Sequence, residues 1–342
     1  MNPVYINGLG NISPLASSPA ELLDFAGKIA AGESLEPGDF SVPREFAPRV
    51  PSSKVRRAPR YAKLATAVAG QAWEDSGLAE GKEETGTVFL SGYGPVATNL
   101  IFEDSVLDGV PSLASPTTFS YTVPNSCLGQ ACIAYGFRGP STMLLGGDPV
   151  EYAALLLDGG KAEHVLCGAV EEWDADLRSS FCAAGQLSGE NIVDGAVMLL
   201  LSSRVGDKKY GKITDFASAS LPAYPYVFPL GMEEQREAIR RMAEVLSEIS
   251  RGQAPGAVLT SRNGSDFDKE EEEALRAVFG GECLYIDGKK YFGEALAAGY
   301  LENIALGACL LQQAKAGTPF SGALIATGVD VHGNYLAARL EA

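Results

Sequence analysis

Short apolar runs of the length of a buried strand recur along the chain, and they alternate with stretches whose apolar residues repeat at helical spacing. A first strand is predicted to begin at residue 4, and further strands at 87–91, 142–145, 164–170, 194–202, 212–219, 257–260, 323–327 and 335–340. Helices are predicted at 21–31, 61–76, 125–135, 233–250, 269–279 and 294–314. Because strands and helices alternate in this way twice, the pattern predicts a duplicated, layered α/β fold.

The stretch from 61 to 76 has a clear amphipathic pattern. Its apolar side chains share one face, and Gly77 follows as a residue suited to end a helix. The residues of that face are Leu64, Ala65, Val68, Ala69, Ala72 and Trp73. Loops are predicted at 32–54, which is rich in Pro and Ser, and at 179–189.

Residues 135–172 contain the most informative local pattern. The apolar run at 142–145 ends at Gly146-Gly147. Asp148-Pro149 then opens a helix, with Asp148 as the N-cap and Glu151 placed to close a capping box. This arrangement presents a side chain at the positive end of a helix, which lowers the pKa of a thiol and stabilises an oxyanion. The position therefore suits a nucleophile, although an Asp there is first of all a helix cap.

Length and charge narrow the possible classes of protein. A chain of 342 residues holds one large domain or two fused halves. Its net charge of -16 disfavours nucleic acid and anionic membrane surfaces as partners. The chain has no apolar run long enough for a transmembrane helix, and its first residues lack the pattern of a signal peptide. These features predict a cytoplasmic protein.

Two small groups of residues add candidate chemistry. Arg56, Arg57, Arg60 and Lys63 form the densest basic cluster, which is typical of a solvated loop and is also the kind of patch that an acidic carrier protein would need. The six cysteines form no CxxC pair, and the chain has two histidines, which disfavours a zinc site. Most of these cysteines lie in apolar surroundings, so reduced, buried thiols are predicted.

Several segments resemble the β-ketoacyl synthases of the thiolase-like fold. Gly139-Pro140-Ser141 and the strand, turn and helix that follow resemble the nucleophile region of that family. The opening strand VYINGLGNISP and the helix RYAKLATAVAGQAWEDSGL resemble its first strand and first long helix. The resemblance implies a thiolase-like α/β fold with a duplicated, five-layer αβαβα architecture. It divides the chain into an N-terminal half at 1–205 and a C-terminal half at 206–342.

The catalytic residues of that family are not found where the resemblance places them. Condensing enzymes of this family use one Cys and two His residues, and counting on to the Cys leads to Asp148. The second His position, after Lys289 and Gly293, is occupied by Glu294, and the loop at 261–266 offers Arg262 and Asn263 in the first His position. All three positions are therefore degenerate by this resemblance, and no catalytic residue is expected.

The other Cys and His residues are interpreted as structural. Cys127 precedes the Gly-Pro-Ser element and has no adjacent base, so a buried thiol is predicted. His164 begins a strand and is expected to be structural, and His332 lies in a turn where a solvent-facing side chain is expected.

With these positions degenerate, the chain resembles a chain-length factor, the inactive partner that dimerises with an active ketoacyl synthase. It implies a heterodimer with such a synthase, or a homodimer, and an acyl carrier protein as a further partner. Polyketide, aryl polyene or fatty acid biosynthesis would be the setting. No cofactor and no metal are expected.

Two alternatives use the same residues. Asp148 and Glu294 could approach each other at two helix N-termini and act as acid and base on carrier-bound acyl thioesters, because paired carboxylates in one pocket can split their pKa values. A non-catalytic acyl-binding scaffold without a synthase partner is the third reading.

Overall fold

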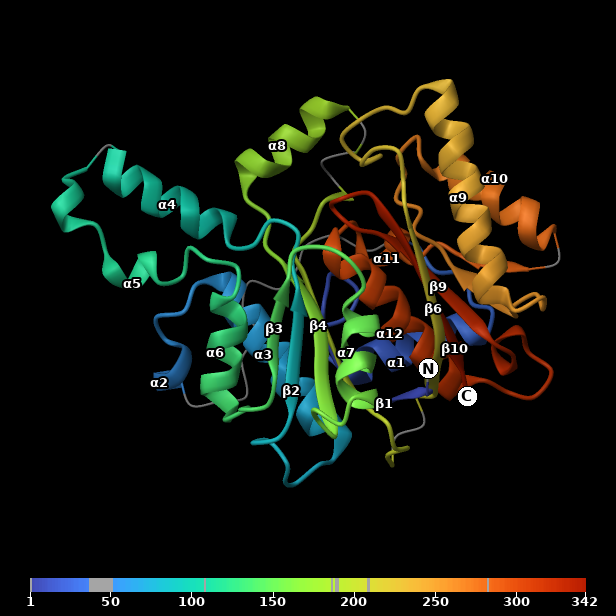
Figure 1. Cartoon of the computed structure of the whole chain (residues 1–342), viewed down its shortest axis with the longest axis horizontal. Coiled ribbons are helices and arrows are strands. Elements are labelled where there is room, and N and C mark those ends of the chain that lie inside the picture. The colour runs from blue at the N-terminus through green and yellow to red at the C-terminus, as the bar shows by residue number, and fades with distance from the viewer. Residues whose placement is uncertain are drawn as a thin grey trace.

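Ten strands form one mixed sheet that organises the molecule (Figure 1). The structure is a computed structural model that describes residues 2–36, 52–107, 109–185, 187, 191–207, 210–281 and 283–342. Its strands are β1 (Val4–Ile12), β2 (Gly86–Leu90), β3 (Ser141–Leu144), β4 (His164–Glu171), β5 (Gly195–Ser202), β6 (Lys212–Ser220), β7 (Ala257–Leu259), β8 (Leu284–Ile286), β9 (Leu324–Val329) and β10 (Asn334–Glu341). The order across the sheet is β3-β2-β4-β5-β1-β6-β10-β9-β7-β8.

The strand order reveals a duplication. Read from the outer edge towards the middle, the first half has the order β3-β2-β4-β5-β1 and the second half the order β8-β7-β9-β10-β6. When the strands of each half are numbered from one to five along the chain, both orders are 3-2-4-5-1. The two first strands, β1 and β6, meet antiparallel at the middle of the sheet. This topology confirms the predicted duplicated α/β fold. The predicted division at residue 205 falls in the connection between β5 and β6 and stays a prediction.

Several helices pack against the strands of the sheet. The described helices are α1 (Pro19–Ala30), α2 (Ser52–Val55), α3 (Arg60–Ser76), α4 (Val96–Leu107), α5 (Pro116–Phe119), α6 (Ser126–Tyr135), α7 (Pro149–Asp158), α8 (Ala175–Ala184), α9 (Met232–Ser250), α10 (Asp268–Phe279), α11 (Lys289–Phe292) and α12 (Ala297–Gln313). Helix α12 contacts strands of both halves, among them β4, β5, β9 and β10, and it is buried from Ala297 to Leu311. The residues that precede α12 are therefore held in the interior.

Helix α3 packs unusually close to the first strand. A Cβ atom at Gly8 would lie 2.3 Å from the carbonyl oxygen of Ala72, and one at Gly10 would lie 2.1 Å from that of Val68. Real side chains do not fit at such distances, so the two glycines allow α3 to lie directly on β1. The predicted apolar face of this helix is buried, as the sequence pattern indicates.

The predicted loop at 32–54 lies mostly outside the described residues, and its last residues, 52–54, belong to α2 instead. Two further predicted boundaries are wrong. Residues 179–184 were predicted as loop but belong to α8, which Asp174 caps through the amide of Asp176 (2.8 Å) and Gly185 ends with a φ of 76°. This helix buries only Phe181, so it lacks the periodic pattern from which a helix is recognised. The second error concerns α12, which begins at Ala297 and not at Glu294.

The sequence predicts no transmembrane helix, and this prediction can be checked against the length and composition of the helices. None of the helices in the described ranges has both the length and the apolar character needed to cross a lipid bilayer.

Candidate functional site

Asp148 caps α7 as predicted. Its Oδ1 accepts hydrogen bonds from the amides of Val150 (2.8 Å) and Glu151 (3.3 Å). Its Oδ2 accepts a hydrogen bond from the hydroxyl of Tyr300, on α12, at 3.0 Å. The predicted capping box is wrong, because the exposed Glu151 side chain makes no return bond to the Asp148 backbone. Burial raises the pKa of Asp148 to about 6 and outweighs the three hydrogen bonds, which lower it.

The turn before α7 is fastened to the C-terminal half. Buried Asp330 accepts hydrogen bonds from the amides of Gly147 (2.7 Å) and His332 (2.9 Å) and from the side chain of Asn334 (2.8 Å). A Cβ at Gly146 would lie 2.1 Å from the His332 ring, so the imidazole rests directly against this glycine. His332 is otherwise exposed, which agrees with the predicted solvent-facing side chain.

A second polar group lies in front of α12. Glu294 is fully buried, and its Oε2 accepts hydrogen bonds from Lys289 Nζ (2.6 Å) and Asn263 Nδ2 (2.7 Å). Its Oε1 accepts one from the amide of Leu296 (2.6 Å), a residue with a φ of 45° that is uncommon for a non-glycine residue. Asn263, Lys289 and Glu294 are called here the buried polar cluster.

The sequence offered two residues, Arg262 and Asn263, for the first His position, and their side chains point to different neighbours in the structure. Asn263 is buried and reaches Glu294, whereas the half-buried Arg262 turns to Asp287 (3.5 Å) and to the ring of Tyr285. The loop is held in place by Asp268, which accepts hydrogen bonds from the amides of Asn263 (3.0 Å) and Gly264 (2.9 Å). Of the two candidates, Asn263 therefore faces the cluster.

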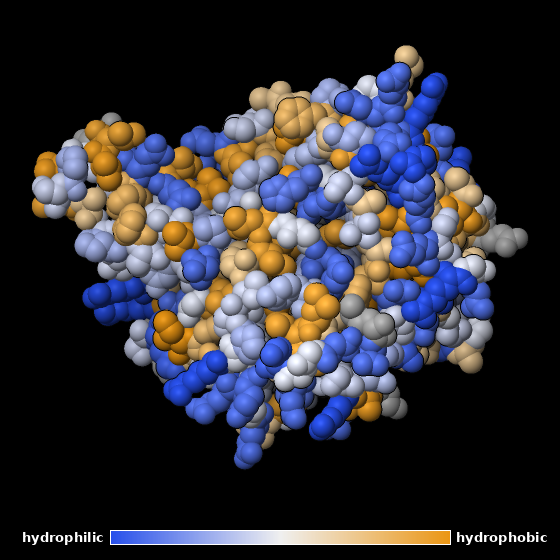
Figure 2. Space-filling view, in the orientation of Figure 1, coloured by the Kyte–Doolittle hydropathy of each residue, from blue (hydrophilic) through white to orange (hydrophobic). Residues whose placement is uncertain are grey.

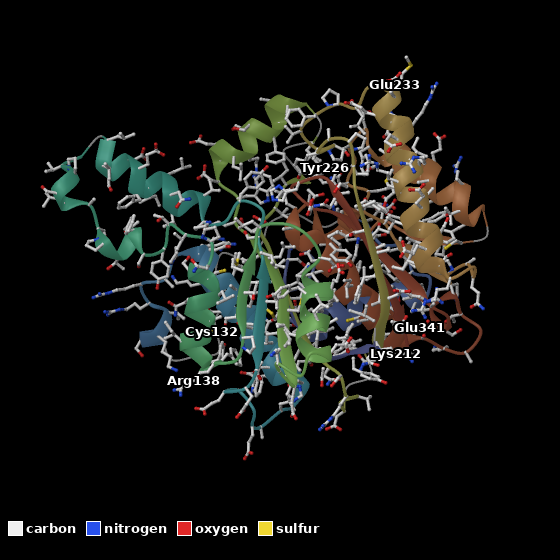
Figure 3. The ribbon with its side chains drawn as sticks, in the orientation of Figure 1. Cys132, Arg138, Lys212, Tyr226, Glu233 and Glu341 are labelled. Carbon is white, nitrogen blue, oxygen red and sulfur yellow. The ribbon has the colours of Figure 1, made fainter. Side chains whose placement is uncertain are left out.

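Aromatic side chains border the buried polar cluster, and no local pattern in the sequence predicts them. Lys289 Nζ donates a hydrogen bond to the hydroxyl of Tyr226 at 3.3 Å. Tyr226 lies at the upper end of the sheet between α8 and α9 (Figure 3). Its ring is followed by those of Tyr224 and Phe181, with centroid spacings of 5.3 and 6.5 Å. The Tyr224 hydroxyl is buried without a hydrogen-bond partner among the described residues.

Three further buried carboxyl groups surround this region, and burial is the main cause of each pKa shift. It raises the pKa of Glu171 and of Glu302 to about 8 and that of Glu172 to about 7. The negative charge of Glu294 also raises the pKa of Glu302, whose two carboxyl oxygens have no partner in the described part of the chain. No local pattern in the sequence marks these residues, because their burial follows from the fold.

The thiols of Cys127 and Cys167 are buried. Burial, and then the charge of Asp148, raises the pKa of the fully buried Cys167 well above its ordinary value. Cys127 is buried in α6 as predicted, where its Sγ contacts the carbonyl of Pro124 (3.3 Å), and burial raises its pKa to about 12. A thiol held in its neutral form is a poor nucleophile.

The structure joins Asp148 and Glu294 to different partners. Within the described ranges, no hydrogen bond or ion pair connects the two carboxylates. Asp148 is bound through α7 and Tyr300, and Glu294 through Lys289 and Asn263. Each carboxylate is therefore held by its own set of hydrogen-bond partners.

A polar cavity of about 340 Å³ borders the buried polar cluster on its outer side. Its lining includes Asn263 and Lys289 together with Asn191, Arg262, Asp268 and Lys290. No group of three or more His, Cys, Asp or Glu side chains is arranged to hold a metal ion among the residues that the structure describes.

Comparisons with known proteins agree with this fold. No protein-family model matches the chain. It is similar to the 3-oxoacyl-[acyl-carrier-protein] synthase 2 of Coxiella burnetii (strain RSA 493 / Nine Mile phase I), with 26% identity over 208 residues that cover 55% of this chain and 50% of that protein. The match thus spans half the length of this curated relative.

Solved structures resemble the whole chain. The ishigamide ketosynthase/chain length factor matches with a TM-score of 0.78 and 17% identity, and a β-ketoacyl synthase from Burkholderia phymatum STM815 with 0.76 and 17%. A type II PKS acyl-carrier protein in complex with its ketosynthase bound to the hexaketide matches with 0.79 and 15%. Each match covers 100% of this chain and 99% or more of the other. The fold is therefore the thiolase-like ketosynthase fold, and the predicted resemblance is confirmed.

Proposed function

We propose that this chain is a ketosynthase-like subunit without condensing activity of its own, which pairs with an active ketosynthase in the manner of a chain-length factor. Its setting would be the synthesis of polyketides, aryl polyenes or fatty acids, with an acyl carrier protein delivering the chain. The proposal places the pair in the cytoplasm and keeps the predicted division at residue 205 between a half with the former nucleophile position and a half with the former His positions.

The bonding at the degenerate positions is the observation that carries this proposal. By resemblance, Asp148 stands at the nucleophile position, and Asn263 and Glu294 stand at the two His positions. The hydrogen bonds of Asp148 and Glu294 use both oxygens of each carboxylate inside the protein. A group that transfers protons or carries an acyl chain needs a free atom that faces the substrate. This arrangement supports a scaffold role at these positions.

An exposed apolar surface supports a protein partner. It lies on α4, α5, α6 and the end of β3, which gather on one side of the molecule (Figure 1), and orange side chains are visible there in Figure 2. Its large exposed residues are Ile101, Leu107, Leu113, Phe119, Ile133 and Leu145. Exposed apolar residues gathered on one face mark protein interaction sites more often than scattered ones do. Strand β3 is also the last strand of the sheet, so its outer edge is open to a further strand.

The experiment is co-expression with an intact Cys-His-His ketosynthase encoded beside this gene, with the mass of the purified species measured in solution. The expected result is a one-to-one heterodimer. The pair should extend an acyl chain on the carrier protein, whereas this chain alone should show no turnover. A stable homodimer that does not bind such a synthase would contradict the proposal.

Matched variants locate the contact. Ile133→Glu places a charge on the apolar surface, at a side chain that is 76% exposed and whose replacement leaves the core intact. It is expected to separate the pair. Phe228→Glu changes a side chain that is 59% exposed, lies outside the helices and strands of that surface and should leave the pair assembled. Equal effects of the two variants would argue against this surface.

The acid–base alternative rests on one observation, the pKa of about 6 at Asp148. A carboxyl group with a pKa in this range can exchange protons near neutral pH. The alternative predicts turnover of acyl-carrier protein by the isolated chain and loss of that turnover in Asp148→Asn. The chain-length-factor proposal predicts no turnover in either protein.

A further inference from the structure

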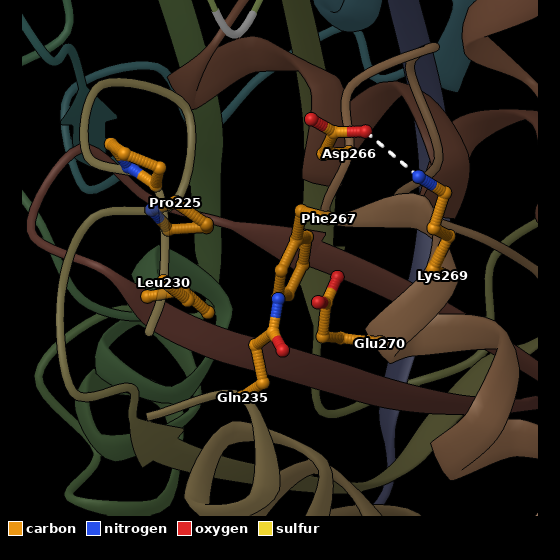
Figure 4. A pocket seen from close by; sticks show the side chains of 8 residues that line it. Pro225, Leu230, Gln235, Asp266, Phe267, Lys269 and Glu270 are labelled. Carbon is orange, nitrogen blue, oxygen red and sulfur yellow. Dashed lines mark hydrogen bonds and ion pairs between the residues drawn. The ribbon is translucent and has the colours of Figure 1, made fainter. Parts of the chain in front are cut away.

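A small pocket that includes none of the degenerate positions lies between the connection from β6 to α9 and the start of α10 (Figure 4). Its volume is about 280 Å³. Apolar atoms come from Pro225, Pro229, Leu230 and Phe267, and polar groups come from Gln235, Glu270 and the Asp266–Lys269 ion pair (2.9 Å). Pockets for drug-sized ligands occupy about 300–1,000 Å³, so this one fits a small molecule or a single side chain.

Glu270 is the unusual member of this lining. Its side chain is only 8% exposed, and its Oε2 is buried without a hydrogen-bond partner in the described part of the chain. The nearby ammonium group of Lys269 binds Asp266 instead. The adjacent Glu271 shares the unpartnered Oε2, but its Oε1 accepts hydrogen bonds from Thr327 (2.7 Å) and Tyr335 (2.9 Å), and it does not line the pocket.

The position of Glu270 in the first turn of α10 explains only part of this arrangement. A carboxylate is favoured near a helix N-terminus by the helix dipole. The dipole does not supply the hydrogen-bond donor that a buried carboxylate oxygen requires, and a buried charge is stable only when it is paired or hydrogen-bonded. The missing donor, together with the cavity beside it, points to a ligand.

The lining identifies the chemistry of that ligand. A cationic donor would satisfy Glu270, and the side-chain oxygen of Gln235 offers a second acceptor across the pocket (Figure 4). The ring of Phe267 can attract the same cation through its π face. Leu230 and the two prolines provide apolar contact for a short aliphatic stem.

We propose that this pocket binds a primary ammonium group carried on a short apolar stem. The group can come from a free alkylamine or from the lysine side chain of another protein, and the two sources share the same chemistry. The proposal is independent of the function proposed above, since none of the residues that line the pocket belongs to the degenerate positions.

Calorimetric titration of the full chain with n-butylammonium chloride tests the proposal, with sodium chloride added to keep ionic strength constant. The expected result is saturable binding at millimolar concentration. Glu270→Gln should weaken it about tenfold or more, because the ammonium group then faces a neutral amide instead of a carboxylate. n-Butanol, which has the same stem without the charge, should bind at least about tenfold more weakly. Equal binding of butanol and butylammonium, or no saturable binding of the amine, would overturn the proposal.

Two further variants guard against a trivial explanation. Glu273→Gln removes an exposed carboxylate three residues further along the same helix and should leave binding unchanged. Gln235→Lys supplies an ammonium group from the opposite wall, and it should raise the melting temperature and abolish binding of the probe. If Gln235→Lys binds butylammonium as the parent protein does, the pocket is not the site.

A last comparison separates the two sources. N-acetyl-lysine methylamide carries the same ammonium group on a peptide unit. If it binds as tightly as n-butylammonium and responds equally to Glu270→Gln, the pocket accepts a lysine side chain. If only the free amine binds with that response, the pocket is a small-molecule site. Either result supports the proposal, and binding of both probes that ignores Glu270→Gln contradicts it.

Discussion

The buried ion pair between Lys289 and Glu294 allows a quantitative test of the reasoning. Its Nζ and Oε2 atoms lie 2.6 Å apart, and the two side chains are 1% and 0% exposed. Removing one partner leaves an uncompensated charge in the interior, which costs about 3–5 kcal/mol. We therefore expect Lys289→Met and Glu294→Leu each to lower the free energy of unfolding by this amount.

The double variant carries the sharper expectation. Replacing both charges removes the desolvation penalty, a gain of about 1–4 kcal/mol in other proteins. It also leaves two donors without a partner, Asn263 Nδ2 and the amide of Leu296, at about 1–3 kcal/mol each. These terms are of similar size, so the double variant should lie within about 3 kcal/mol of the parent protein. The two single effects should thus be coupled by about 3 kcal/mol or more.

Equilibrium urea unfolding followed by fluorescence and by far-UV circular dichroism measures these differences, and coincident transitions establish that one unfolding step is observed. Lys290→Met is the control, because it removes the next, exposed lysine and should change stability by no more than about 0.5 kcal/mol. A loss below about 1 kcal/mol in Lys289→Met would contradict this expectation, since that is the effect of a solvated surface pair. Glu294 would then be free to react, and the acid–base alternative would gain support.

Three further predictions concern single positions. Asp148→Ala should lower stability by about 0.5–2 kcal/mol in thermal unfolding because the α7 cap is lost, and Asp148→Asn should largely keep it. Burial raises the pKa of Glu302 from an ordinary 4.5 to about 8. The folded chain therefore holds this proton longer than the unfolded chain, and stability should fall between pH 4.5 and 8. Glu302→Gln should flatten that decline by up to about 1.4 kcal/mol per pH unit, and exposed Glu233→Gln should not, as urea unfolding at several pH values will tell. Gly10→Ala should prevent the close packing of α3 on β1 and yield little folded protein. An alanine at half-buried Gly129, with open space around its Cβ position, should be tolerated in expression and circular dichroism.

The elements with strong local signals were predictable from the sequence. Helix α3 combines an apolar face with an ending glycine, and α7 begins at Asp-Pro and ends before Gly159. Such signals depend on residues a few positions apart, so they survive without knowledge of the fold. Helix α8 was missed because its caps were present but its apolar period was not. Three-residue strands such as β8 lack enough residues to show any period.

For the candidate site, the sequence predicted which positions to inspect but not how their side chains are bonded. The resemblance pointed to Asp148, Glu294 and the 261–266 loop, but it did not decide between Arg262 and Asn263. That choice depends on Asp268, which closes the loop so that the Asn263 side chain turns inward. The predicted approach of Asp148 and Glu294 at two helix N-termini also required tertiary information, because α12 starts after Glu294, at Ala297.

The bonding pattern leads to a wider conclusion about where chemistry is possible in this chain. At Asp148 and Glu294 the fold supplies donors for both carboxylate oxygens, which holds these side chains in place. Glu270 lines a cavity, and its Oε2 accepts no hydrogen bond from the described residues. Glu302 also lacks hydrogen-bond partners in the described part of the chain, but it lines none of the cavities described above, so Glu270 is the unpaired acid that a ligand could reach. The positions inherited by resemblance thus support a scaffold, and the unpaired acid beside the α9–α10 pocket is the better place to search for a bound molecule.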